Sequence, residues 1–274
     1  MGLTLDSVVT LPSGATLPVL GFGTAGATGR TCVAAVGEAL RVGYRLIDTA
    51  SMYGNDREIG IAVRESGIPR EDIFITTKVA SSGQGPRSTP KALEASLIRL
   101  GLDYVDLYLI HWPARRKRVA TWEAMTSFLE SGLARAIGVS NFMVGHLEEL
   151  RAANDTPPAV NQIELSPFLQ QREVVADCRA HGIQVEAYSP LTRGRRLSDP
   201  TITRMAAKYG KSPAQVLIRW SLQHDFVAIP KSARPERIRE NAEVFDFTLA
   251  PADMESLDRL DRGQHFDWDS SHVP

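Results

Sequence analysis

Eight short apolar segments, separated by longer amphipathic stretches, constrain the fold of this chain more than any other feature. They are almost unbroken in apolarity, as expected for strands that are buried on both faces of a parallel sheet. Eight strands alternating with helices is the number that closes a (β/α)8 barrel, so we predict an α/β fold of this class, a TIM barrel. The segments are PVLGFG (18–23), YRLID (44–48), IFITTK (73–78), VDLYLIHW (105–112), ARAIGVSN (134–141), AVNQIELS (159–166), QVEAYSP (184–190) and VAIPKS (227–232).

Helices are predicted between these strands, and a hairpin before them. The amphipathic stretches cover 30–42, 56–66, 88–101, 119–131, 143–153 and 170–181, with room for extra helices near 199–209 and 212–223. The turn PSG between SVVTL and TLPVLG indicates an N-terminal β-hairpin. Barrels of this length are commonly one domain, so we expect a single domain over residues 1–274.

A doubly wound dinucleotide-binding fold is the alternative. Gly21, Gly23 and Gly26 formally match the pattern G-x-G-x-x-G. That fold also requires an acidic residue at the end of the next strand, about 20 residues on, whereas Asp48 comes later and is followed by Tyr53. A lone match of this kind is weak, and we therefore favour the barrel.

Composition excludes several classes of partner. The 31 basic and 32 acidic residues give a net charge of −1, which favours neither nucleic acid nor a membrane surface. We expect no signal peptide and no membrane span, since no apolar run approaches ~20 residues. Cys32 and Cys178 lie in helical stretches, and we expect buried thiols rather than a disulfide or a reactive pair. These features indicate a cytoplasmic protein, and we expect a monomer.

Polar side chains end seven of the predicted strands. In a barrel these carboxyl ends converge on one rim, which carries the active site. Residues far apart in the sequence are therefore expected to meet there. The strand-end residues are Asp48, Lys78, His111, Asn141, Gln162, Tyr188 and Lys231.

The first of these residues suggest proton transfer. Asp48 and Lys78 can be buried as a pair when neither could be buried alone. A lysine beside Tyr53 is expected to lower the pKa of the phenol and make it a proton donor, while His111 adds a hydrogen bond to a carbonyl oxygen. Each residue also has a purely structural explanation, such as an ordinary ion pair or a core histidine. The sequence contains no serine or cysteine nucleophile beside a base and no metal-ligand spacing, so the reacting atom is expected from a cofactor, for example as hydride.

Long, ordered motifs resemble the aldo-keto reductase superfamily, and most closely its microbial diketogluconate and aldehyde reductases. The matching segments are RLIDTASMYGNDREIG, ITTK, LYLIHWP, GVSNF, NQIELSP, AYSP and IPKSARPERIREN. The resemblance implies a catalytic tetrad of Asp48, Tyr53, Lys78 and His111. In it Tyr53 gives a proton to an aldehyde or ketone that is reduced by hydride from a nicotinamide cofactor.

The resemblance also implies a cofactor site, with NADPH preferred over NADH. An arginine and a lysine beside a hydroxyl at a helix start suit a 2′-phosphate, which is the role implied for Lys231, Ser232 and Arg237. Glu240 and Asn241 are implied at the adenine, and Ser140, Asn141 and Gln162 at the nicotinamide carboxamide. Tyr188 is implied to stack on the nicotinamide, and Arg193 to meet the pyrophosphate. The remaining implied cofactor-binding residues are Gly23, Thr24, Ser189 and Leu191.

The expected substrate side departs from the family pattern. Ala25 stands where many members carry a tryptophan, which widens the pocket, and Trp112, Phe266 and Trp268 are expected to reach the substrate. Basic loops at 115–118 and 193–196 suggest a modest preference for anionic or polyhydroxylated carbonyls, although such charges are often merely solvated.

We therefore predict NADPH-dependent reduction of small aldehydes, dicarbonyls or keto sugars. One alternative is a barrel isomerase or aldolase that uses Lys78 as a base or Schiff-base former. Another is a redox-sensing barrel that binds NADPH tightly and turns over slowly.

Overall fold

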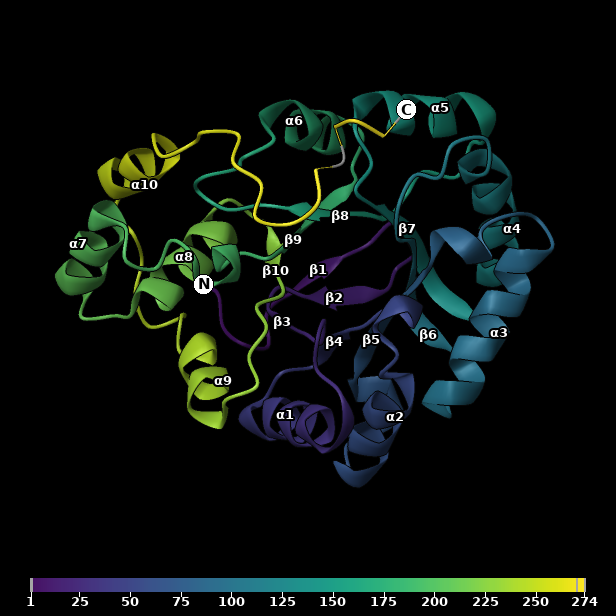
Figure 1. The fold of residues 1–274 in the computed structure, drawn as a ribbon, viewed down its shortest axis with the longest axis horizontal. Helices are drawn as coiled ribbons and strands as arrows, with labels where there is room; N and C mark the ends of the chain where they lie inside the picture. Colours follow the sequence, from purple (N-terminus) through teal and green to yellow (C-terminus); the bar gives the residue numbers. More distant parts are fainter. Residues whose placement is uncertain (1, 270, 274) are drawn as a thin grey trace.

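The chain forms a closed parallel β-barrel surrounded by helices (Figure 1). The structure is a computed structural model that describes residues 2–269 and 271–273; residues 1, 270 and 274 of the predicted domain lie outside this description. Strands β3 to β10 pair in chain order, and the bridge between Leu20 and Ala228 joins the first strand to the last. The predicted (β/α)8 fold is confirmed. The barrel strands are β3 Gly21–Gly23, β4 Leu46–Asp48, β5 Phe74–Val79, β6 Val105–Ile110, β7 Ala134–Ser140, β8 Val160–Glu164, β9 Gln184–Tyr188 and β10 Val227–Ala228.

Helices cover the outside of the barrel on all sides (Figure 1). The predicted helices are present with ends that differ by one or two residues, and the structure adds α10, which the sequence pattern did not indicate. The α-helices are α1 Gly29–Val42, α2 Asp56–Glu65, α3 Ser88–Leu100, α4 Arg118–Glu130, α5 Val144–Ala153, α6 Arg172–Ala180, α7 Pro200–Tyr209, α8 Pro213–Gln223, α9 Pro235–Ala242 and α10 Pro251–Asp258. Short 3-10 turns lie at η1 Ser51–Tyr53, η2 Arg70–Asp72, η3 Ser81–Gly83 and η4 Thr192–Gly194.

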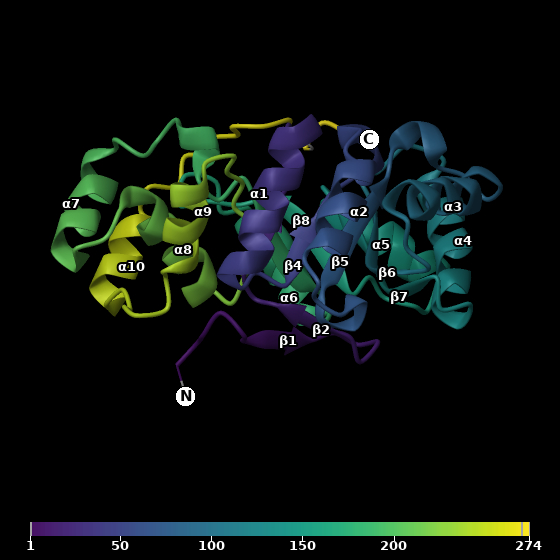
Figure 2. The same cartoon turned by 90° about the horizontal axis from the view of Figure 1, so that it is seen from below.

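The N-terminal hairpin closes one end of the barrel. Its strands β1 Val8–Thr10 and β2 Thr16–Pro18 pair antiparallel, with Val9 opposite Leu17. Leu17 is fully buried and belongs to an apolar cluster that also contains Leu46 and Leu107 from the barrel strands. Figure 2 shows the hairpin below the barrel, on the side away from the C-terminus. The hairpin therefore covers this end of the barrel.

A larger apolar core fills the layer between strands and helices. Strand residues such as Ile47 and Ile75 pack there with Trp122 of α4, and all three are fully buried. Cys32 and Cys178 lie in this core as free thiols, as predicted. Among the described residues, no helix combines the length and apolarity needed to cross a membrane.

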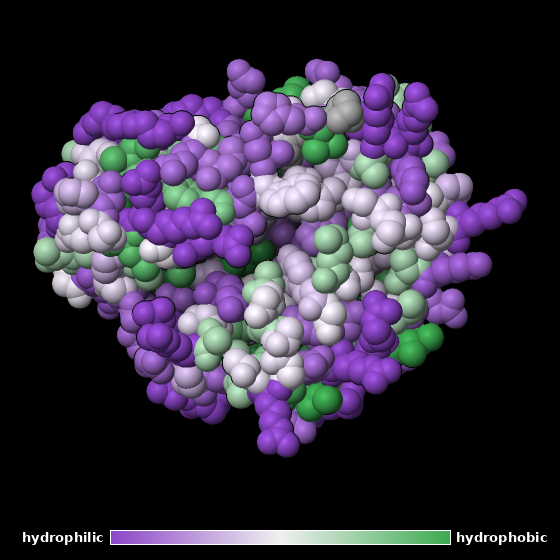
Figure 3. Space-filling view, viewed as in Figure 1, coloured by the Kyte–Doolittle hydropathy of each residue, from purple (hydrophilic) through white to green (hydrophobic). Residues whose placement is uncertain are grey.

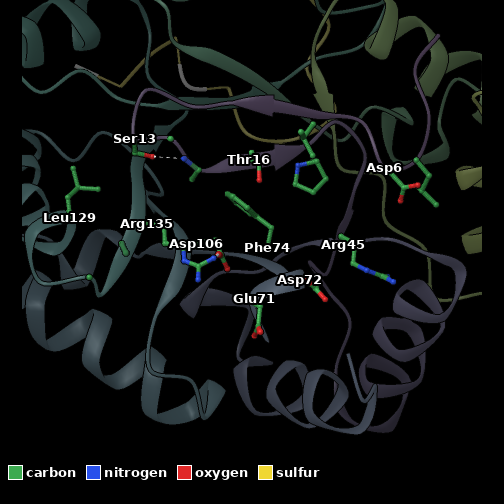
Figure 4. A pocket seen from close by; sticks show the side chains of 17 residues that line it. Asp6, Ser13, Thr16, Arg45, Glu71, Asp72, Phe74, Asp106, Leu129 and Arg135 are labelled. Atoms are coloured by element: carbon green, nitrogen blue, oxygen red, sulfur yellow. Dashed lines mark hydrogen bonds and ion pairs between the residues drawn. The ribbon is translucent and has the colours of Figure 1, made fainter. Parts of the chain in front are cut away.

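A cavity of about 840 Å³ lies at the hairpin end (Figure 4). Its most buried charge is Asp106, which forms ion pairs with Arg70 at 2.7 Å and Arg135 at 3.2 Å. The same two guanidinium groups stack on the ring of Tyr104, at 4.1 and 4.2 Å from its centroid. Because these charges satisfy one another, they stabilise this end of the barrel.

Close packing of α2 against the end of α3 gives the first prediction. A Cβ atom on Gly60 would lie 2.0 Å from the carbonyl oxygen of Leu100, so Gly60→Ala forces the two helices apart. We expect it to lower the free energy of unfolding by ~1–3 kcal/mol, the usual cost of overpacking. Gly37→Ala in α1 is the matched control, since nothing lies within 4 Å of its Cβ position. It should be stabilising by roughly 0.5–1 kcal/mol. Urea denaturation measures both, and equal effects would contradict the packing argument.

Candidate functional site

The open end of the barrel holds a cavity of about 1330 Å³. Its lining includes residues at or just beyond the carboxyl ends of the barrel strands, from Gly23 at the end of β3 to Lys231 after β10. The space-filling view of this face is hollowed near its middle (Figure 3). The predicted convergence of strand ends on one rim is therefore present in the fold.

Asp48 and Lys78 form a buried ion pair beneath this cavity. Their strands β4 and β5 are neighbours, and the two side chains are 2% and 0% exposed. The Lys78 Nζ atom donates to both Asp48 carboxylate oxygens at 2.6 and 2.8 Å and to the Thr49 carbonyl at 2.9 Å. Gln162 Nε2 donates to Asp48 Oδ2 at 2.8 Å. All three ammonium protons thus have acceptors, which is what allows the charge to be buried.

The Tyr53 phenol lies beside this pair. It ends the turn η1, and its ring centroid is 5.3 Å from Lys78 Nζ. Burial raises the pKa of Tyr53 and is the largest influence on it. The positive charge of Lys78 lowers this pKa, and the negative charge of Asp48 raises it again. The predicted net lowering is therefore wrong. Lys78 acts in the expected direction, but the loss of solvent around the phenol outweighs it, so the group holds its proton at neutral pH.

His111 meets Tyr53 edge to face, with ring centroids 5.7 Å apart. Burial, followed by the charge of Lys78, lowers the pKa of His111 to about 3. The imidazole is therefore neutral, and it can donate one hydrogen bond to an oxygen in the cavity without carrying charge.

Polar residues at the carboxyl ends of β7 to β9 form hydrogen bonds along one wall of the cavity. Tyr188 Oη donates to Asn141 Oδ1 at 2.9 Å, and Asn141 Nδ2 donates to the His111 carbonyl at 2.9 Å. Ser140 Oγ donates to the Gln162 carbonyl at 2.9 Å. Asn141 has a left-handed backbone with φ 64°, which an asparagine tolerates better than most residues. All four residues line the cavity, so the residues predicted to meet the nicotinamide lie together on one wall, and their role stays a prediction.

The far end of the cavity is basic and lies at the start of α9. Lys231, Ser232 and Arg237 line it together with Glu240 and Asn241. Lys231 and Arg237 are both exposed, and neither forms an ion pair with any residue that the structure describes. Two unpaired cations beside a helix N-terminus are suited to a phosphate group.

Gly23, Thr24 and Ala25 form the part of the lining next to β3. A Cβ atom on Gly23 would lie 3.0 Å from the Ile229 carbonyl oxygen, so a glycine suits the close approach of β3 to the segment after β10. Thr24 is fully buried and its hydroxyl donates to the Asp48 carbonyl at 2.9 Å. This contact ties the loop after β3 to the strand that carries Asp48.

The loop after β9 is held by the C-terminal segment. Ser189 Oγ donates to Asp267 Oδ2 at 3.0 Å, and Arg193 Nη1 donates to Asp267 Oδ1 at 2.9 Å. Glu164, 2% exposed, accepts hydrogen bonds from the backbone nitrogens of Phe266 at 2.8 Å and Asp267 at 3.2 Å. Leu191 also lines the cavity. The sequence reasoning missed Asp267 and Glu164, although their carboxylates stand beside predicted site residues.

Two substrate-side expectations need correction. Phe266 does not line the cavity; it is 4% exposed and packs on Phe168, with ring centroids 6.3 Å apart, because the tail turns it toward the core. Residues 115–118 do not line the cavity either, and Arg118 pairs with Glu149. Of the second basic loop, 193–196, only Arg193 and Gly194 line it. The structure therefore gives the predicted preference for anionic carbonyls little support.

The remaining predicted substrate residues do reach the cavity. Ala25, Trp112 and Trp268 all line it. Trp268 is 79% exposed and its ring meets Trp112 edge to face at 6.1 Å between centroids. The two indoles form an apolar part of the cavity rim, and Ala25 contributes a small side chain to the same lining.

Comparison with known proteins gives consistent matches along the chain. The model of the family described as "Aldo/keto reductase family" matches residues 19–262. The glyoxal reductase of Bacillus subtilis (strain 168) is 46% identical over 265 residues, covering 96% of each chain. An aldo/keto reductase structure from Brucella melitensis has a TM-score of 0.90 and 46% identity, over 93% of this chain and 99% of that one.

A third similar protein is a Bombyx mori aldo-keto reductase whose structure is a complex with NADP. It is 34% identical, with a TM-score of 0.91, over 97% of this chain and 96% of that one. Because the family model spans most of the chain and the relatives match it nearly end to end, this chain belongs to the aldo/keto reductase family.

Proposed function

We propose that this protein reduces small aldehydes, dicarbonyls or keto sugars to alcohols with NADPH, with Tyr53 as the proton donor. The observation that carries the proposal is a single cavity with two chemically different ends. One end holds a protonated phenol and a neutral imidazole above a buried ion pair, and the other holds two unpaired cations. A carbonyl group suits the first end and a phosphate the second.

Each polar residue of the catalytic end has a distinct task in this proposal. NADPH, when bound, supplies the hydride that is added to the carbonyl carbon. Tyr53 gives its phenolic proton to the carbonyl oxygen, so that an alcohol forms, and Lys78 stabilises the phenolate that remains. The neutral His111 donates a hydrogen bond that orients the carbonyl oxygen. Asp48 keeps Lys78 charged and fixed in place through its two hydrogen bonds.

The cofactor residues divide the cavity between the two ends of NADPH. We assign the carboxamide to Ser140, Asn141 and Gln162, and the nicotinamide face to Tyr188. The 2′-phosphate is assigned to Lys231, Ser232 and Arg237, and the adenine to Glu240 and Asn241. Gly23, Thr24, Ser189, Leu191 and Arg193 complete the cofactor-binding residues along the lining between them.

The substrate side favours small and varied carbonyl compounds. Ala25 leaves one wall open, and the rim of Trp112 and Trp268 is apolar and partly exposed. The similarity to a glyoxal reductase supports a dicarbonyl among the substrates. A panel of glyoxal, methylglyoxal, simple aldehydes and keto sugars, assayed by NADPH oxidation, tests this assignment. Tight NADPH binding without turnover of any of them would contradict it.

The proposal also includes one domain, a monomeric state and a cytoplasmic location. The large apolar side chains that are exposed among the described residues, such as Met52, Ile98 and Leu133, lie on different elements rather than in one patch. Scattered exposed residues of this kind need no partner surface. Light scattering on the purified protein tests the monomer.

Replacing the proton donor gives the second prediction. Tyr53→Phe removes the phenolic proton but keeps the ring against His111, so folding and NADPH affinity should remain close to those of the wild type. We expect the turnover number for an aldehyde to fall by about 10²-fold or more, as is usual when a positioned acid is lost. Steady-state kinetics with NADPH titration by fluorescence measures both quantities. An unchanged turnover number would rule out Tyr53 as the donor.

Cofactor choice gives the third prediction. Arg237→Gln removes a charge-assisted contact to phosphate worth roughly 1.5–3 kcal/mol. The dissociation constant for NADPH should rise about tenfold or more by the same relation, with little change for NADH. Arg234→Gln is the matched control, since Arg234 precedes the same helix, is exposed and does not line the cavity. If both variants weakened NADPH binding equally, Arg237 would not be the residue that distinguishes NADPH from NADH through the 2′-phosphate.

A further inference from the structure

Glu186 is a second carboxyl group below the catalytic end of the cavity. It lies on β9, two residues before Tyr188, and alternation along the strand places both side chains on the interior face of the barrel. Glu186 is fully buried, and neither of its carboxyl oxygens has a hydrogen-bond partner among the described residues. A buried carboxyl group without partners is costly when it is ionised. The tasks assigned to the catalytic residues above leave Glu186 without a role.

The charged neighbours of Glu186 are the two members of the ion pair. Burial has the largest effect on the pKa of Glu186 and raises it, and the charge of Asp48 on β4 raises it further. The charge of Lys78 on β5 and the Gln162 side chain, from the paired position on β8, lower it. The paired position on β10 is Val227, which is apolar. Among the other interior residues, Leu46, Leu107, Leu109 and Val160 from β4, β6 and β8 are apolar. Thr76 of β5, opposite Asp48, is fully buried, and its hydroxyl has no hydrogen-bond partner among the described residues.

Lys78 cannot balance two carboxylates. Its three ammonium protons are already donated to the two oxygens of Asp48 and to the Thr49 carbonyl. An ionised Glu186 would therefore add an uncompensated negative charge to the buried interior of the barrel. Burial, with the charge of Asp48, accordingly raises the pKa of Glu186 to about 8.

We propose that Glu186 is a positioning residue for proton transfer: it remains a neutral carboxylic acid beneath the Asp48–Lys78 pair and keeps the charge of this group at zero. In that state the positive charge of Lys78 lowers the pKa of the Tyr53 phenol without opposition from a second carboxylate. When Glu186 loses its proton, the group beneath the phenol becomes negative and the phenol gives up its own proton less readily. This inference rests on the proposed role of Tyr53.

The pH profile of the chemical step tests the positioning role. Glu186→Gln keeps the shape and the neutral state but cannot ionise, so the single-turnover rate of aldehyde reduction near neutral pH should stay within about twofold of the wild type. The basic limb of the profile should move to lower pH by about one unit, because no negative charge then holds the proton on Tyr53. A limb that does not move would overturn the proposal.

Thr77→Val is the matched control for this experiment. Thr77 adjoins Lys78 on β5, is fully buried, and its hydroxyl has no partner among the described residues. Its neighbours Ile75 and Val79 belong to the outer core, so its side chain points away from Glu186. The control should leave the limb in place, and an equal shift in Thr77→Val would also overturn the proposal. If Glu186→Gln fails to fold, Glu186→Met replaces it with the same expected shift.

Thermal stability tests the neutral state independently of activity. The pKa of folded Glu186, about 8, lies above its ordinary value of 4.5, so the stability it contributes is complete below 4.5 and is lost as pH rises to 8. The melting temperature of wild type should therefore fall relative to Glu186→Gln between about pH 5 and about pH 8. A constant difference would mean that Glu186 is ionised throughout and would overturn the proposal.

The two measurements separate this inference from the proposed function. If Tyr53→Phe retained its activity, the proton donor would be wrong, while the melting temperatures would still report the state of Glu186. If Tyr53→Phe lost activity and Glu186→Gln left the basic limb of the pH profile in place, the proposed function would stand and the proposed role of Glu186 would be wrong.

Discussion

A lysine ammonium with no exposure to water is the constraint on which the catalytic end of this barrel depends. Lys78 can remain charged there because Asp48 and the Thr49 carbonyl accept all of its protons. Burial by itself lowers the pKa of Lys78, but the charge of Asp48 and its hydrogen bonds to the ammonium raise it above its ordinary value. The neutral state of His111 follows in part from the same charge. Because burial excludes water, each charge in this cluster sets the protonation state of its neighbours.

The closed parallel barrel is what makes this pair possible. β4 and β5 are adjacent and in register, so that Asp48 lies opposite Thr76 and Lys78 reaches across from two residues further along. The hairpin seals the other end, and the apolar residues around Leu17 and Leu46 keep the interior dry. The C-terminal segment then crosses the open face, where Glu164 and Asp267 hold it against the loop after β9. The cavity therefore has a buried floor, and late segments of the chain complete its rim.

Most of the fold could be predicted from the sequence, because strand and helix periodicities are local properties. The departures have local causes too. The predicted strand 227–232 is short, β10 Val227–Ala228, since Pro230 has no backbone N–H to continue the ladder. The helix α10 was missed, although it starts at Pro251, a typical first helical residue, because its apolar positions are few.

What the sequence determined by itself is the set of residue types at the strand ends. Parallel strands end at one rim of a barrel, so the alternation of strands and helices along the sequence was enough to predict that Asp48, Lys78 and His111 meet there. Only the tertiary structure decided the direction of the Tyr53 pKa, because burial and the nearby charges oppose one another and their balance depends on distances. It also decided that Phe266 packs in the core and that Asp267 engages Arg193. These outcomes depend on contacts between segments far apart in the chain, which no local pattern encodes.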